Sequence, residues 1–208
     1  ALASFDAATG VLTMIAGSQG ANRQRDTLAR AFGLPRDRVR VVCPDVGGGF
    51  GPRTNLYPEQ AAVAWAARRL GRPVRWTSTR SEAFLADFQG RDLVTDVRLG
   101  LAADGRITGY SVTMTGNVGA HTVSYVPLAN GYRILTTVYD VPATHVRVRG
   151  VVTNTVGTTP YRGAGRPEAT YVIERLLDEA AAALGLDRVE IRRRNLVPRA
   201  RMPYRSPM

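Results

Sequence analysis

The chain has 208 residues, of which 44% are hydrophobic and 22% charged, and its formal net charge is +11. Its single cysteine, Cys43, excludes an internal disulfide and indicates a reducing compartment. No apolar run is long enough to cross a bilayer, and the first residues lack a secretory signal pattern. We therefore predict a cytoplasmic protein without a membrane partner. Residues 1–208 are predicted to form a single domain or lobe of a larger protein.

The positive charge comes from arginine alone, because the sequence contains no lysine. A basic chain is compatible with a nucleic-acid or anionic partner. The arginines are spread along the chain, however, and the densest groups, "RQR", "RDRVR" and "IRRRN", are not interleaved with aromatic residues that could stack on bases. We favour a solvated face or a docking face for an acidic partner, and keep a basic nucleic-acid-binding module as an alternative function.

The first predicted elements alternate between strand and helix. The run "GVLTMIAGSQG" predicts a strand that ends in a turn over 17–20. A helix is predicted over 21–33, with Gly33 as its stop. The alternation of "DRVRVVCPDV" then predicts a strand over 37–46, which runs directly into a glycine-rich stretch.

The middle of the chain adds a second helix and four strands. Pro58 suits the first position of a helix over 58–71, and a strand is predicted over 73–80. Residues 92–121 indicate two strands joined by a hairpin turn at "ADG", and 145–155 a further strand.

The last part of the chain is predicted to be helical. An apolar stripe runs through 166–185, which begins near Pro167 and ends at a glycine, and a short helix over 187–195 begins at Asp187 as its cap. The residues 199–208 are expected to form a loose tail. Strand–helix–strand units mixed with hairpins predict an α+β (mixed α/β) class, with mixed sheets and packed helices.

Three polar turns are candidate ligand sites. The stretch "GGGFG", residues 47–51, lets the backbone approach a ligand closely, but it fits neither the P-loop nor the dinucleotide fingerprint. Gln19 offers a donor and an acceptor after a strand. In "TTPYRGAGRPE", Arg162 and Arg166 precede a helix, an arrangement that favours an anion. Each turn is also compatible with an ordinary structural or solvated loop.

The residues themselves nominate no metal-binding or acid–base constellation. His121 and His145 are far apart and lack metal-ligand spacing, and no Ser-His-Asp set is present. We therefore predict no catalytic residue within this chain.

The three turns together, in the order "SQG", "GGGFG" and "YRGAGRPE", resemble the xanthine dehydrogenase and aldehyde oxidase family. More narrowly, the chain is similar to the first molybdopterin-binding domain of the large subunit of carbon-monoxide-dehydrogenase-like members. The resemblance covers essentially the whole chain and includes "AAVAWAARRLGRPVRW" and "LDRVEIRRRNLVP". It implies a bacterial molybdenum-dependent hydroxylase that uses water as its oxygen source.

The resemblance also assigns roles to residues. It places Gln19, Phe50 and Arg162 in the molybdenum environment, on a molybdopterin whose electrons leave through iron–sulfur clusters and FAD on other domains or subunits. The implied cofactor-binding residues are Gln19, Gly48, Gly49, Phe50, Gly51, Arg162 and Gly163. The family's catalytic base is a glutamate in a "GxGE"-like sequence, which is absent here. The resemblance therefore implies that the remainder of the large subunit is a partner, and that the isolated chain is inactive and cofactor-free. A naturally split cofactor-binding subunit is a second form of this interpretation.

Departures from the family pattern bear on the substrate. Thr54 stands where xanthine oxidases carry a substrate-facing Glu, Asn130 falls near the place of a second substrate-facing Arg, and Ala164 replaces a ring-stacking Phe. Gly163 stands where carbon monoxide dehydrogenases carry a copper-binding Cys. These departures disfavour a purine and carbon monoxide, and leave an aldehyde or an N-heterocycle as the small-molecule substrate.

Overall fold

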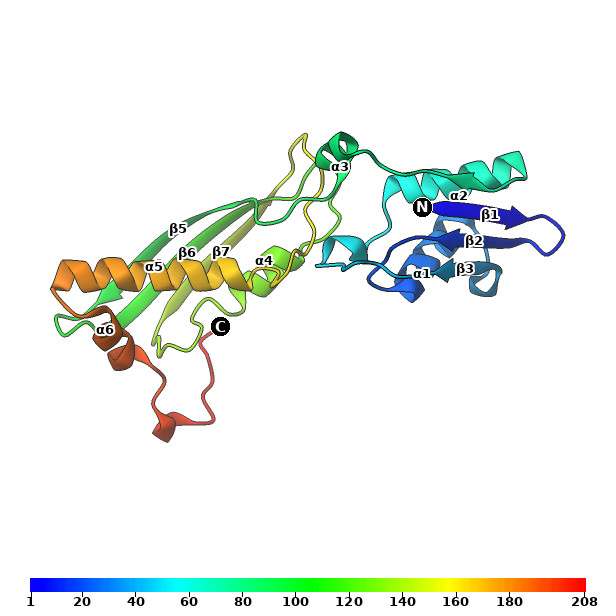
Figure 1. Ribbon diagram of the computed structural model, residues 1–208. Coiled ribbons are helices and arrows are strands. Elements are labelled where there is room, and N and C mark those ends of the chain that lie inside the picture. The colour runs from blue at the N-terminus through cyan, green and yellow to red at the C-terminus, as the bar shows by residue number, and fades with distance from the viewer. The chain divides into compact units, whose positions relative to one another are not determined.

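The computed structural model describes every residue from 1 to 208, and the chain divides into two compact units, residues 1–87 and 88–208. Figure 1 shows the first unit in blue to cyan-green and the second in green to red. That residues 1–208 act as a single domain or lobe stays a prediction. Each unit has its own sheet, helices and hydrophobic core.

The first unit is a four-stranded mixed sheet with the order β3-β2-β1-β4. β2 runs parallel to β3, because a helix connects them, whereas β1 pairs antiparallel with β2 and with β4. The helical elements of this unit are α1, α2 and α3, with short 3₁₀ turns η1 and η2. The bounds of the unit's strands and helices are β1 Leu2–Asp6, β2 Val11–Ile15, α1 Ala21–Phe32, η1 Arg36–Arg38, β3 Val39–Val42, η2 Pro52–Thr54, α2 Pro58–Leu70, β4 Val74–Arg75 and α3 Arg80–Ala86.

The core of the first unit lies where α1 and α2 pack on this sheet. Leu12 and Met14 alternate along β2 toward the helices, and Leu28 of α1 is fully buried against them. Small residues dominate the buried face of α2, where Ala64 and Ala67 are fully covered. Gly33 and Gly71 end the two helices in the left-handed conformation, which confirms the predicted stops.

The second unit is a three-stranded sheet with the order β5-β6-β7. β5 and β6 form the predicted antiparallel hairpin, whose turn places Gly105 at φ 84°, and β7 runs parallel to β6. The long helix α5 crosses one face of this sheet (Figure 1). The bounds are β5 Leu93–Leu101, β6 Ile107–Asn117, α4 Val126–Tyr132, β7 Thr144–Val151, α5 Arg166–Leu184, α6 Arg188–Asn195 and η3 Arg199–Arg201.

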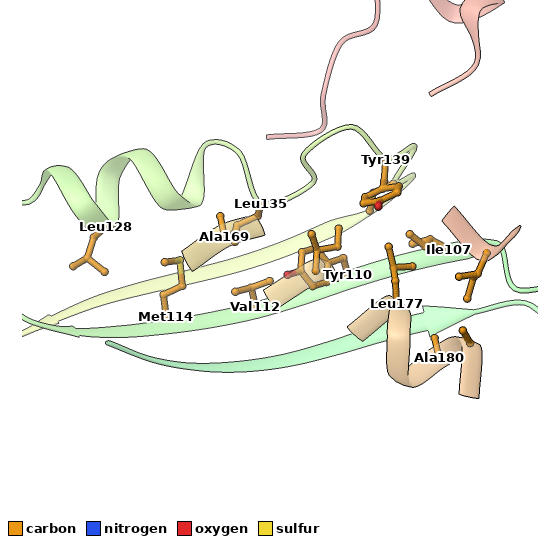
Figure 2. Packing of buried hydrophobic residues seen from close by; sticks show 14 of the residues in the cluster. Ile107, Tyr110, Val112, Met114, Leu128, Leu135, Tyr139, Ala169, Leu177 and Ala180 are labelled. Carbon is orange, nitrogen blue, oxygen red and sulfur yellow. The ribbon is translucent and has the colours of Figure 1, made fainter. Parts of the chain in front are cut away.

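One hydrophobic core holds the second unit together. Figure 2 shows Val112 and Met114 of β6 in the same packed layer as Leu128 of α4 and Leu177 of α5. Leu177 is fully buried, so truncating it to alanine would cost about 2–5 kcal/mol. The core thereby fixes the start of α5, which follows directly on the third polar turn.

The structure confirms the α+β class and adds elements that the sequence pattern did not predict: β1, α3 and α4. The strand predicted over 37–46 is only Val39–Val42, preceded by a 3₁₀ turn. The strand predicted over 73–80 is reduced to β4, because Thr79 caps α3 with its side chain. Local capping chemistry here overrides the apolar alternation on which the strand prediction relied.

A few contacts tie the last ten residues to the second unit. Arg201 pairs with Asp140, the Ser206 hydroxyl lies 3.2 Å from that of Thr136, and Met208 packs against the core. The looseness of this tail in solution stays a prediction. None of the helices has the length and apolar character of a membrane span.

Candidate functional site

The turn after β2 and the glycine-rich loop are tied together within the first unit. The backbone N–H of Gln19 donates to the carbonyl of Arg53 at 3.0 Å, and the Arg53 guanidinium donates to the carbonyl of Val46 at 3.1 Å. A Cβ at Gly17 would lie 2.5 Å from that guanidinium, so a side chain there would displace it. The two predicted segments therefore form one local structure.

Gln19 lies at the centre of this structure. Its Oε1 accepts a hydrogen bond from the backbone N–H of Gly51 at 2.7 Å and a longer one from the Thr54 hydroxyl at 3.4 Å. Because both partners are donors, the amide is oriented with its oxygen toward the loop. Its Nε2 group has no acceptor within the chain, and the residue is exposed. Gln19 thus presents a free donor outward.

This arrangement requires glycine at position 49 because there is no room for a side chain, and not because of the backbone conformation. A Cβ at Gly49 would lie 2.7 Å from Oε1 of Gln19 and 2.9 Å from its Cδ. Any side chain at this position would therefore push the Gln19 amide out of its place.

The rest of the loop exposes backbone donors. Gly48 and Gly51 have φ values of 109° and 106°, which favour glycine, and Phe50 itself has φ 51°. The N–H groups of residues 47–50 have no acceptor within the chain. Successive free N–H groups in such a turn form a concave anion-binding surface. Phe50 is 54% exposed as a residue, and its ring lies against Gly48, where a Cβ would be 2.5 Å away.

The third turn lies in the second unit, directly before α5. Arg162 is exposed, and its guanidinium makes no ion pair or hydrogen bond within the chain. The three residues that follow, Gly163, Ala164 and Gly165, all have positive φ (89°, 43° and 89°). The N–H of Ala164 donates to the carbonyl of Tyr161 at 2.7 Å, which closes a tight turn. This geometry presents Arg162 as an unpaired cation next to exposed backbone.

Two of the predicted substrate positions belong to neighbouring segments of this unit. A Cβ at Gly165 would lie 2.1 Å from the carbonyl oxygen of Pro127 and 2.6 Å from the N of Gly131, so α4 touches the backbone of the turn. Asn130 precedes Gly131 and Ala164 precedes Gly165, so each of these two predicted residues is next in the chain to a residue of this contact. Thr54, the third, lies in the first unit on η2, where it contacts Gln19.

The sequence pattern missed Arg91, which lies two residues before β5. Its guanidinium donates to the carbonyl of Arg162 and stacks over the Tyr161 ring at 4.5 Å. A lone arginine in "FQGRD" gives no signal of such a role, because its partners lie about 70 residues later in the chain.

Titratable groups do not form a second site. No group of three or more His, Cys, Asp or Glu side chains could hold a metal ion. Burial and a 2.6 Å hydrogen bond donated to Glu174 raise the pKa of Tyr139, and Arg192 also binds Glu174, at 2.7 Å. This network joins α5, α6 and the segment before β7, so it is structural.

The fold is that of a cofactor-binding domain of the kind found in molybdenum hydroxylases. The chain belongs to the molybdopterin cofactor-binding domain family, which it matches over residues 1–196. It is 36% identical to the carbon monoxide dehydrogenase large chain of Hydrogenophaga pseudoflava, over 98% of this chain and 26% of that protein. It is also 36% identical to subunit gamma of the 6-hydroxypseudooxynicotine dehydrogenase complex of Paenarthrobacter nicotinovorans, over 86% of this chain and 23% of that protein.

A solved structure confirms the fold. Quinoline 2-oxidoreductase from Pseudomonas putida 86 superposes with a TM-score of 0.94 at 33% identity, over 98% of this chain and 26% of that one. The chain therefore spans about a quarter of the length of the relatives that it matches. Membership of the family confirms the resemblance seen in the three turns.

Proposed function

We propose that this chain forms one part of the molybdopterin site of a molybdenum hydroxylase large subunit. The observation that carries the proposal is the orientation of Gln19, whose oxygen is held by Gly51 while its Nε2 donor stays free. When bound, the cofactor would supply the two-electron oxidation of a substrate carbon, with water as the oxygen source. Iron–sulfur and flavin groups on other domains or subunits would accept the electrons.

The residues of the first unit fit such a group. Molybdopterin is anionic and carries oxygen atoms on its metal, so it needs hydrogen-bond donors at close range. Gln19 would donate to an oxygen of the cofactor, and the free N–H groups of residues 47–50 would bind its anionic part. Gly48, Gly49 and Gly51 keep the backbone open to this approach, and Phe50 would shield the loop from water.

The second unit would contribute Arg162 and the turn at Gly163. An unpaired guanidinium is expensive to bury unless an anion compensates it, so Arg162 is suited to a negatively charged cofactor. The catalytic base is not assigned to any residue of this chain. We infer that the remainder of the subunit supplies it, together with the rest of the cofactor site.

We propose an aldehyde or an N-heterocycle as the substrate. The small or neutral residues Thr54, Asn130 and Ala164 replace the groups that would bind a purine, and Gly163 offers no thiol for copper. The similarity to a quinoline oxidoreductase supports the N-heterocycle in particular. Steady-state kinetics with quinoline, an aromatic aldehyde, xanthine and carbon monoxide would separate these classes, and turnover of xanthine or carbon monoxide alone would overturn the proposal.

The test of the site is Gln19→Glu in the complete enzyme. Glutamate keeps an oxygen for Gly51 but removes the Nε2 donor, so we expect turnover to fall by about 10²–10³-fold. Asn154→Asp, an exposed amide-to-acid change in the second unit, is the matched control and should leave turnover unchanged. Equal activity of Gln19→Glu and the wild-type enzyme would contradict the assignment of Gln19.

The 208 residues alone are expected to bind no molybdenum and to have no hydroxylase activity, because the base and part of the site lie elsewhere. Metal analysis of the purified chain measures this directly. Molybdenum in a one-to-one ratio with the chain would show that these residues suffice to hold the cofactor.

A further inference from the structure

The segment before β5 lies along the third turn of the second unit. Gln89 forms a bridge with Thr158, its N–H donates to the carbonyl of Gly157 at 3.1 Å, and its own carbonyl accepts from the N–H of Thr159 at 2.9 Å. A Cβ at Gly90 would lie 2.8 Å from the Cβ of Tyr161, so glycine permits this close approach. The backbone of residues 89–90 therefore supports the turn up to Tyr161.

Arg91 continues this support with its side chain. Its guanidinium donates to the carbonyl of Arg162, lies 4.5 Å from the centre of the Tyr161 ring, and has its Nε 3.9 Å from Oε1 of Glu168 in the first turn of α5. Glu168 is itself largely covered, with 11% of its side chain exposed. One side chain thus binds the residue before Arg162, Arg162 itself and the helix that follows.

These contacts restrain the backbone of Arg162 but not its side chain. The Arg162 guanidinium stays unpaired, while its carbonyl and the preceding ring are fixed. Arg91 has φ 57°, a conformation that residues with a side chain rarely adopt and that persists where surrounding contacts determine it. Arg91 is thus strained, and its guanidinium binds one loop. Both features are explained if the position of that loop matters for function.

We propose that Arg91 is a positioning residue, which holds the turn 158–166 so that Arg162 is aimed at the anionic cofactor. The inference rests on the proposed function, because the proposed function supplies the cofactor that Arg162 would contact. Arg91 itself touches no cofactor in this scheme. Its planar guanidinium is needed, because a lysine ammonium could pair with Glu168 but could not stack on Tyr161 and donate to the carbonyl at once.

The first measurement is hydrogen exchange in the complete enzyme. Arg91→Met removes the guanidinium and keeps an apolar stem, and we expect faster amide exchange in peptides covering 158–166 with no change in β6. Arg175→Met is the control, because it removes an arginine and its surface ion pair with Glu179 from the same helix that carries Glu168. Unchanged exchange over 158–166 in Arg91→Met would overturn the proposal.

The second measurement is a double-mutant cycle with Arg162→Met, read as kcat, KM and molybdenum content. A misaimed Arg162 should lower kcat by about 10²-fold. In the Arg162→Met background, Arg91→Met should then change kcat by less than about twofold, because Arg91 acts through Arg162. Arg91→Lys should recover only part of the loss, whereas full recovery would show that charge alone is needed and would contradict the positioning role.

The cycle separates the inference from the proposed function. If Arg162→Met lowers kcat or molybdenum content but the effect of Arg91→Met simply adds to it, the inference fails and the proposed function stands. If Arg162→Met changes neither quantity, the cofactor role of Arg162 fails and the inference fails with it.

Discussion

In the first unit, the candidate site combines backbone N–H groups with the side chain of Gln19, which holds the glycine-rich loop by accepting hydrogen bonds from Gly51 and Thr54. In the second unit, the site is made of a side chain, Arg162, on a turn that is fixed from outside by α4 and by Arg91. The first arrangement joins two loops near the surface, through residues 32 positions apart in the sequence. The second arrangement depends on the core of its unit. Substitutions at the residues that support the turn should therefore affect the stability of the whole unit.

The largest expected effect comes from Gly165→Ala. The added Cβ would lie 2.1 Å from the carbonyl oxygen of Pro127, and φ is 89°, so both backbone strain and a clash with α4 result. We expect a loss of about 3 kcal/mol or more in the free energy of unfolding. Urea unfolding of the chain, followed by circular dichroism, measures it.

Gly185→Ala is the matched control, because Gly185 also has positive φ, 66°, but has nothing within 4 Å of its Cβ position. It should cost only about 1 kcal/mol. Equal losses for the two variants would mean that α4 does not hold the turn, and the contrast between the units would disappear.

A smaller effect is expected from Asn195→Ala, at the end of α6. Asn195 is 3% exposed; its Oδ1 accepts from the N–H of Ile107 and its Nδ2 donates to the carbonyls of Gly105 and Ile191, each at 2.8 Å. Removing the amide leaves buried groups unpaired, which should cost about 1–3 kcal/mol. The same urea titration measures the loss, and the exposed Asn154→Ala should change the free energy by no more than about 0.5 kcal/mol.

Gly49→Ala tests the first unit, where we expect little change in stability and a large local effect. The three atoms nearest to the added Cβ all belong to the Gln19 side chain, which is exposed and can move, so the free energy of unfolding should fall by less than about 1 kcal/mol. Nuclear magnetic resonance should nevertheless show a shifted Gln19 amide and faster exchange of the Gly51 N–H. Gly47→Ala, with open space around its Cβ, should leave the Gln19 amide in place.

The smallest effect concerns the pH dependence of α3. The pKa of Glu82 is held below its usual value, mainly by a hydrogen bond from the Thr79 backbone N–H and secondarily by one involving the Thr79 hydroxyl. Because the folded pKa is the lower one, the stabilisation is complete above the unfolded pKa and is lost as the pH falls through the folded pKa. A carbon-13 titration of Glu82 should show this together with fraying of residues 80–86. A Glu82 that titrates at or above its usual value would contradict the capping box.

Much of the fold follows from local patterns in the sequence. Gly33, Gly71 and Gly185 end their helices where predicted, and Asp187 caps α6 with its side chain. The strands β5 and β6 follow their alternation, which depends only on neighbours along the chain. By contrast, α4 gave no periodic signal, because it is short and Pro127 and Gly131 are buried in its contacts with the rest of the unit.

The sequence by itself determined the family and the three turns, because glycines that admit a close approach and an arginine before a helix are visible as residue types at fixed spacing. Only the tertiary structure decided how the Gln19 amide is oriented and that Arg91 fixes the backbone of Arg162. Those facts depend on pairs separated by 32 and 71 positions. A hydrogen bond between such residues exists only once the chain has folded, and no local sequence pattern predicts it.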